Sequence, residues 1–105
     1  MTTLDPAPVL AAVCGDERLA AFTREGRIQA MPARHARRLL LLDIVAGAFE
    51  PGVRYPEREV SQFLGELYPD YAALRRYLVD EGFLSRDGGE YWRSGGTVDG
   101  PVPAP

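Results

Sequence analysis

The stretch DYAALRRYLVDEGFLSRDGGEYWR, residues 70–93, decides the fold of this 105-residue chain. Its first half predicts a helix over residues 70–81, because apolar side chains recur there at the spacing of a helix face. Asp70 is suited to be the N-cap, since its carboxylate can accept a hydrogen bond from a backbone N–H of the first turn. Gly82 is expected to end the helix. The side chains expected on its buried stripe are Tyr71, Leu74, Tyr77 and Leu78.

Residues 83–93 predict a β-hairpin whose turn is the Asp-Gly-Gly segment after Arg86. A three-residue loop would set Arg86 opposite Glu90, which pairs two charges at the tip. It would also set Leu84 opposite Trp92, which pairs two apolar side chains nearer the core. A two-residue turn at the Asp-Gly pair would leave the charges unmatched. The three-residue loop is therefore favoured.

Two further helices are expected upstream, over residues 34–49 and 56–67, with a short β-prone segment at residues 53–55 between them. The first helix is apolar over most of its circumference after its basic first turn, which is typical of a central core helix. Pro56 at the first position of the second helix agrees with the preferences of a helix start. The side chains predicted to form the core are Leu41, Leu42, Val45, Phe49, Phe63, Leu64, Leu74, Leu78 and Trp92.

This pattern divides the chain into three parts. Residues 1–23 are expected to hold two short helices, one capped by Asp5 and a second capped by Asp16. Residues 24–93 form the main domain, which opens with a short edge strand. Residues 94–105 are Gly- and Pro-rich with little to bury, so we expect a disordered tail.

The composition excludes several classes of protein. The single cysteine, Cys14, rules out an internal disulfide and argues against most zinc sites. No apolar run approaches the roughly 18 residues that span a bilayer, and the N-terminus lacks the features of a signal peptide. We therefore expect a cytoplasmic protein with no membrane attachment and no cofactor.

Charge is distributed unevenly along the chain. The 12 basic residues are all arginine, and the formal net charge is −3. Residues 24–38 carry +4, from five arginines against one glutamate, whereas residues 43–70 carry −4, from two arginines against six acids. An acidic chain can thus present a basic face.

The expected order of elements from residue 34 is helix, short strand, helix, tight turn, helix and hairpin. This is the order of a winged helix-turn-helix domain, in which two short helices pack on a long one and the hairpin covers the remaining apolar edge. The fold class is therefore α+β and mainly helical. In that architecture residues 70–81 are the recognition helix and residues 86–90 the tip of the wing.

Several short motifs extend across the main domain. Residues 49–52 read Phe-Glu-Pro-Gly, residues 55–60 read Tyr-Pro-Glu-Arg-Glu-Val, and residues 74–80 read Leu-Arg-Arg-Tyr-Leu-Val-Asp. Together with Gly26-Arg27, the basic cluster after Pro32, and Arg86 through Trp92, they make this chain resemble the bacterial family called domain of unknown function 2087.

This resemblance implies a bacterial regulator, because members look like parts of transcriptional regulators, some with the domain behind an ArsR-type helix-turn-helix. It supplies no ligand, operator or binding residue. About 18 residues precede the matching stretch here, and residues 10–19 look like the opening helix of such a preceding domain. If DNA is bound, we expect this domain itself to bind it.

A hypothesis of duplex DNA binding follows from the arginines. Small side chains such as Ala72 on the exposed face of the recognition helix allow close approach to a groove, where Arg75 and Arg76 suit guanine edges or phosphates. Arg86 at the wing tip would reach the backbone or the minor groove. The basic first turn of the helix at 34–49 opposes the helix dipole, so an external anion is one explanation for it. Its arginines are Arg34, Arg37 and Arg38.

Each of these arginines also has a structural alternative. Arg76 has Asp80 one turn away, Arg75 has the acids of the preceding helix, and Arg86 has Glu90 as a partner in the hairpin. The basic first turn would likewise pair with acids elsewhere in the fold.

Catalysis is not expected, because neither the sole histidine, His35, nor Cys14 has a partner at the spacing of a known motif. Tyr55, Tyr68 and the hairpin aromatics fit packing better than base stacking. The alternative to DNA binding is a winged-helix module that binds a protein partner or forms a homodimer, which the acidic second helix would suit.

Overall fold

A computed structural model describes residues 4–97 of the chain. Within that range the fold is α+β, with four α-helices and two small antiparallel sheets, and about half of the described residues are helical. The helices are α1 (Pro6–Gly15), α2 (His35–Ala46), α3 (Glu57–Leu67) and α4 (Tyr71–Asp80). The strands are β1 (Thr23–Arg24), β2 (Arg27–Ile28), β3 (Tyr55–Pro56), β4 (Leu84–Asp87) and β5 (Glu90–Arg93).

The three helices expected in the main domain are present. Asp70 is the N-cap of α4, and its Oδ1 accepts a hydrogen bond of 3.1 Å from the Ala73 backbone N–H. Helix α3 starts one residue later than expected, because Pro56 is its N-cap and ends strand β3 rather than opening the helix. The helix expected over residues 34–49 is shorter, because α2 ends at Ala46 and a tight turn carries the chain to Phe49.

The N-terminal part differs from the expectation at its second helix. Asp5 caps α1 by accepting from the Ala7 N–H at 3.1 Å, as predicted. The helix expected after Asp16 is reduced to a single 3₁₀ turn, η1 (Ala20–Phe22). The Asp16 carboxylate accepts from the Arg18 backbone N–H and also binds the Arg18 guanidinium, at 2.9 and 2.8 Å. After this turn the chain makes only the short 3₁₀ turn and enters β1.

The hairpin has a shorter loop than we expected. Strands β4 and β5 are joined by the two residues Gly88 and Gly89, and Asp87 lies opposite Glu90. Both glycines have positive φ, 57° and 80°, which is the requirement of the type I′ turn that matches the twist of a hairpin. The three-residue loop was therefore wrong, and Arg86 lies opposite Tyr91 rather than Glu90.

The change of register exchanges the two faces of β5, while Leu84 of β4 stays buried as expected. Tyr91 is completely buried, whereas Trp92 is half-buried on the other face of β5. The prediction that Trp92 belongs to the core was wrong, because a shift of one residue moves each side chain to the opposite face. Tyr55 in β3 pairs with Tyr91, so β5 is the middle strand of the sheet β3-β5-β4.

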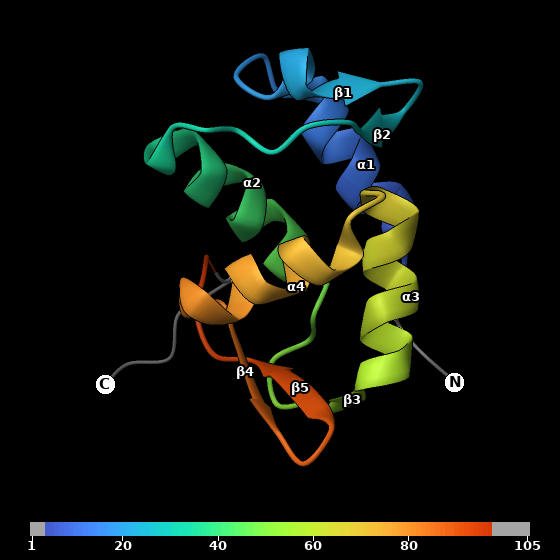
Figure 1. Ribbon diagram of the computed structural model, residues 1–105, viewed down its shortest axis with the longest axis vertical. Coiled ribbons are helices and arrows are strands. Elements are labelled where there is room, and N and C mark those ends of the chain that lie inside the picture. The colour runs from blue at the N-terminus through green and yellow to red at the C-terminus, as the bar shows by residue number, and fades with distance from the viewer. Residues whose placement is uncertain (1–3, 98–105) are drawn as a thin grey trace.

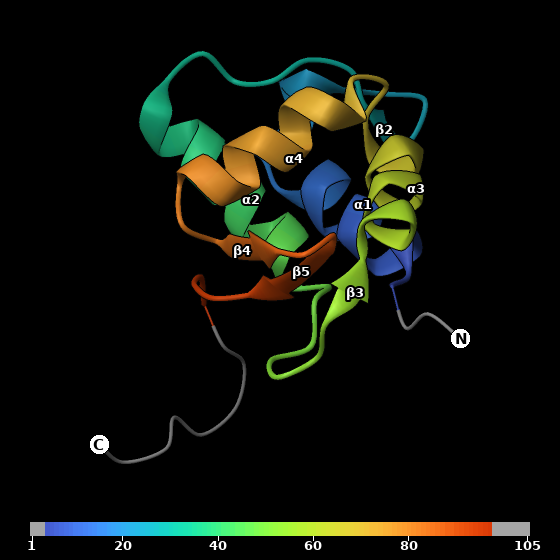
Figure 2. The same ribbon diagram turned by 60° about the horizontal axis from the view of Figure 1, so that its bottom comes forward.

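The core lies between the helices and the inner face of this sheet. Figure 1 shows α4 crossing the molecule between α2 and α3, with the three-stranded sheet at one end and β1 and β2 at the other. The turned view of Figure 2 shows α1 behind α4. The completely buried side chains include all the predicted core positions except Trp92 and Phe63, the latter being 3% exposed. They also include Val13 and Leu19 from the N-terminal part.

Residues 94–97, the start of the segment expected to be a tail, are held to the body of the protein. The Arg93 guanidinium donates to carbonyl oxygens of Gly95, Thr97 and Phe49. Thr97 donates through its backbone N–H and its hydroxyl to the Asp43 carboxylate, at 2.7 and 2.8 Å. The rest of the expected tail, residues 98–105, lies outside the described residues.

Candidate nucleic-acid interface

Arg76 is on the outward face of α4, directly opposite the buried Leu74 and Leu78. Its side chain is exposed and forms no hydrogen bond or ion pair with any of residues 4–97. The alternative pairing with Asp80 is thus not formed. Ala72, one turn earlier, is also exposed, so no bulky side chain precedes Arg76 on this face.

Arg75 lies on the flank of α4 that faces α3. It is half-buried, and its Nη1 donates a hydrogen bond of 2.5 Å to Ser61 Oγ on α3. Its guanidinium carbon lies 5.9 Å from the centroid of the Tyr71 ring and 6.0 Å from that of Tyr91. Arg75 therefore binds a hydroxyl and two aromatic rings, and not an acid of the preceding helix.

Arg86 extends from β4 and also approaches the Tyr91 ring. Its guanidinium carbon lies 5.6 Å from the Tyr91 ring centroid, and its Nη2 lies 3.9 Å from Glu57 Oε1. Glu90, the partner we expected for Arg86, instead lies 3.6 Å from Arg54. The altered hairpin register explains this exchange of partners.

Tyr91 is central to this group of charges. Its hydroxyl donates a hydrogen bond of 3.0 Å to Glu57 Oε1, and its ring is fully buried. Burial and the bond to Glu57 raise the pKa of the Tyr91 phenol above its ordinary value, against the opposing effect of Arg75 and Arg86. The phenol is thus a proton donor at neutral pH.

The basic first turn of α2 contains two kinds of arginine. Arg34 and Arg37 are exposed. Arg38 is half-buried, and its Nη1 donates to the carbonyl oxygens of Pro32 and Ala33 at 3.3 and 3.1 Å. Its guanidinium carbon also lies 5.1 Å from the Tyr77 ring centroid. Arg38 therefore has an internal role, although its buried Nε has no hydrogen-bond partner among the described residues.

The predicted arginines do not gather in one cluster. His35 Nε2 lies 2.5 Å from Glu81 Oε2, which sets the basic start of α2 beside the end of α4. Arg75 and Arg86 lie on the other flank of α4, toward α3 and the hairpin. The two groups lie on different flanks of α4, because Arg38 of α2 approaches Tyr77 whereas Arg75 contacts Ser61 of α3.

Several contributors to this surface were missed in the sequence. Glu57 and Ser61 stand one helical turn apart on α3, and that spacing was the available signal for a shared face. Tyr71, which we expected to be buried, is 42% exposed beside Arg75. Trp92 lies outside the group, with the Arg54 guanidinium carbon 4.2 Å from its ring centroid.

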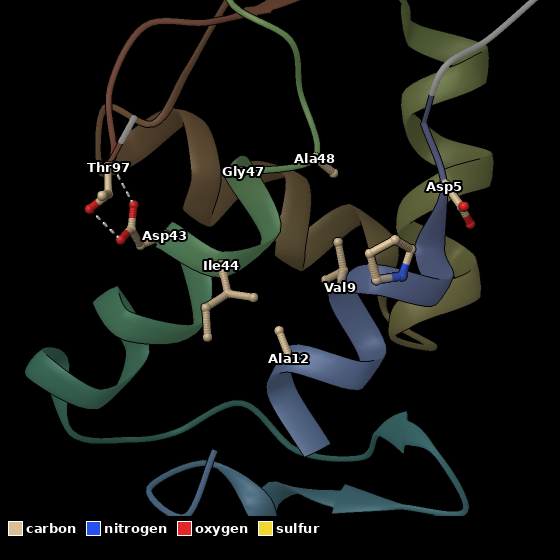
Figure 3. A pocket seen from close by; sticks show the side chains of 9 residues that line it. Asp5, Val9, Ala12, Asp43, Ile44, Gly47, Ala48 and Thr97 are labelled. Atoms are coloured by element: carbon tan, nitrogen blue, oxygen red, sulfur yellow. Dashed lines mark hydrogen bonds between the residues drawn. The ribbon is translucent and has the colours of Figure 1, made fainter. Parts of the chain in front are cut away.

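A separate groove of about 490 Å³ lies between α1 and α2. Val9, Ala12, Ile44 and Ala48 line it with apolar surface, and the hydrogen-bonded pair of Asp43 and Thr97 stands at one side (Figure 3). Figure 3 also shows α4 passing behind α2 in this view, so the groove opens on the side of α2 away from α4. None of the described residues that line it is an arginine.

Among residues 4–97, no group of three or more His, Cys, Asp or Glu side chains is arranged to hold a metal ion. None of the helices in this part of the chain has both the length and the apolar character needed to cross a membrane.

Comparison with known proteins gives a match to a protein family. The family model described as "Uncharacterized protein conserved in bacteria (DUF2087)" matches residues 27–93. No curated protein and no solved structure matches the chain. The matched range begins at β2 and ends with β5, so it includes α2, α3, α4 and the three-stranded sheet.

Proposed function

Because the chain belongs to the bacterial family DUF2087, whose members are uncharacterized, its function must come from its own surface, and we propose that it is a DNA-binding transcriptional regulator of winged-helix type. The observation that carries this proposal is the outward face of α4, where Arg76 is exposed and unpaired within the described residues. Such a regulator would act in the bacterial cytoplasm.

The arrangement of the elements supports a winged-helix reading. Helices α3 and α4 are joined by the short turn at residues 68–70, as the two helices of a helix-turn-helix are. The short strand β3, which follows α2, pairs with the hairpin strand β5 in one sheet. In a winged helix of this order α4 is the recognition helix and the turn at Gly88 and Gly89 is the tip of the wing.

The proposed role of Arg76 is to read a base in the major groove. A free guanidinium fork can donate two hydrogen bonds to the O6 and N7 atoms of guanine, and the small side chain of Ala72 permits a close approach. Arg34 and Arg37 would contact phosphates beyond the end of α4. Arg38 is left out of the interface, because its guanidinium is engaged by backbone carbonyls and Tyr77.

The test is a selection from random duplexes at about 50 mM salt, followed by affinity measurements on the enriched sequence. Arg76→Ala is expected to cost about 1–3 kcal/mol on that sequence and less on random DNA, whereas Arg37→Ala should weaken both alike. If four to six phosphates are contacted, log affinity should fall with log salt at a slope of about −4 to −5. Arg24→Ala, an exposed arginine on β1, is the matched control.

A second candidate function is a protein-interaction or dimerisation module, and the groove between α1 and α2 favours it. Its apolar lining, on the side of α2 away from α4, is a surface where a partner or a second copy would bury area. If the selection enriches no sequence and the arginine variants behave like the wild type, this second function replaces the first. Sedimentation at several concentrations would then report self-association.

A further inference from the structure

We infer that Arg75 and Arg86 form a clamp for one phosphate group of the DNA backbone, and that Glu57 is a built-in counter-charge that the phosphate displaces. This inference rests on the proposed function and adds a site to it. The two arginines come from different elements, α4 and β4, and their guanidinium carbons lie 6.0 and 5.6 Å from the centroid of the Tyr91 ring. Two cations thus approach one buried phenol.

Neither guanidinium is neutralised by a closely bound carboxylate. Arg18 provides the contrast, because its Nε and Nη2 donate to both oxygens of Asp16 at 3.0 and 2.8 Å. The contact of Arg86 with Glu57, at 3.9 Å, is too long for a hydrogen bond. Arg75 uses one donor on Ser61, and a guanidinium has five. Both side chains therefore keep donors available for an added anion.

The chemistry of the group favours a phosphate. Arginine forks bind phosphate oxygens with two parallel hydrogen bonds, and phosphate offers acceptors on several sides at once. The position agrees with a backbone contact, since Arg86 lies in the wing and Arg75 on the flank of α4 rather than on its outward face. A backbone phosphate carries no sequence information, so this site would add affinity for every duplex equally.

Glu57 limits that affinity in the free protein. Its Oε1 accepts the Tyr91 hydroxyl at 3.0 Å and lies 3.9 Å from Arg86 Nη2, so its negative charge would repel a phosphate that binds at Arg86. Glu57 is 44% exposed in its side chain, which leaves room for it to turn toward solvent. Binding of DNA then requires the ion pair between the Glu57 carboxylate and Arg86 to break.

Glu57→Gln distinguishes the effect of the Glu57 charge on DNA binding from its structural role. Glutamine keeps an oxygen that accepts the hydrogen bond from Tyr91 and loses only the charge. We expect Glu57→Gln to raise the affinity for both random and selected duplexes about fivefold at low salt. The same substitution in an Arg86→Ala background should give no gain. Arg86→Ala alone should weaken both duplexes about equally, by several-fold, and reduce the salt slope by about 1.

The measurement is fluorescence anisotropy of labelled duplexes across a range of salt, with circular dichroism to show that each variant is folded. Arg75→Lys keeps the charge and loses the fork, so it tests the clamp without removing the contact to α3 entirely. Arg24→Ala, which removes the same charge from β1, is expected to change neither affinity nor slope by as much as Arg86→Ala.

Each remaining outcome decides against the clamp. If Arg76→Ala abolishes sequence preference while Arg86→Ala, Arg75→Lys and Glu57→Gln leave affinity and slope unchanged, the clamp is wrong and DNA binding stands. If inorganic phosphate alone binds at micromolar concentration and Arg86→Ala removes that binding, the site takes a free anion and not a DNA phosphate. If neither the wild type nor Glu57→Gln binds any duplex at about 50 mM salt, the clamp fails together with the proposed function.

Discussion

The hydroxyl of Tyr91 donates a 3.0 Å hydrogen bond to Glu57 Oε1, and this bond joins the middle strand of the sheet to the first turn of α3. The same carboxylate lies 3.9 Å from Arg86, while Arg75 reaches the ring from α4. One buried phenol therefore connects α3, α4 and the hairpin, the three elements that make up the candidate interface.

Tyr91→Phe should reduce the loss of stability at alkaline pH. The pKa of Tyr91 is raised in the folded protein, so the folded state holds the phenol proton more tightly than the unfolded chain does. The contribution of the protonated Tyr91 phenol to the free energy of unfolding is fully present below the unfolded pKa of about 10. It is lost as pH rises through the folded pKa. Denaturant unfolding between about pH 9 and 11.5 should show a shallower decline for Tyr91→Phe than for the wild type. Parallel declines would contradict this assignment.

Leu74→Ala should lower the free energy of unfolding by about 2–5 kcal/mol. Leu74 is 0% exposed on the inner face of α4, so truncation removes buried methyl groups and leaves a cavity. Urea titration followed by circular dichroism measures the change. Ala72→Ser, on the outward face of the same helix, should stay within about 0.5 kcal/mol of the wild type.

Asp70→Ala should destabilise the protein by about 1 kcal/mol, because the Ala73 N–H loses its acceptor at the start of α4. Asp70→Asn keeps a side-chain oxygen at the cap and should lie within a few tenths of a kcal/mol of the wild type. Equal stability of the alanine and asparagine variants in the same urea titration would show that the cap does not contribute.

Arg38→Ala and Arg37→Ala should have different effects on stability and on DNA binding, although the two residues are neighbours in the chain. Arg38 donates to two backbone carbonyls and packs on Tyr77, so its loss should cost about 1–3 kcal/mol of stability. Arg37 is exposed, and its loss should change stability by no more than about 0.5 kcal/mol while weakening DNA binding. A thermal melt and a binding titration on both variants separate the two effects.

The helices could be predicted because their signals are local. The apolar stripe of α4, the cap at Asp70 and the start of α3 within one residue of Pro56 each depend on a few neighbouring residues. The hairpin register could not be decided by side-chain pairs alone. Cross-strand pairs are worth a few tenths of a kcal/mol, and the backbone requirement for positive φ at Gly88 and Gly89 outweighed them.

The sequence predicted that arginines make up the candidate site but not which residues each of them contacts. Arg76 is as exposed as the helical spacing indicated. The internal role of Arg38 and the contact of Arg75 with Ser61 depend on how α2 and α3 pack against α4, which no local pattern encodes. The position of Glu57 beside Arg86 depends in turn on the hairpin register.

The packing of α1 against the core determines how far the chain can be truncated at its N-terminus without loss of folding. The family match begins at residue 27, yet Val13 and Leu19, both 0% exposed, lie upstream of it and fill the same core as Leu41 and Leu42. A recombinant fragment trimmed to the matched range would expose the surfaces of α2 and α3 that α1 covers. Its expected fate is aggregation, so the smallest independently folding unit for expression extends back at least to Leu4, which is itself 8% exposed in that core.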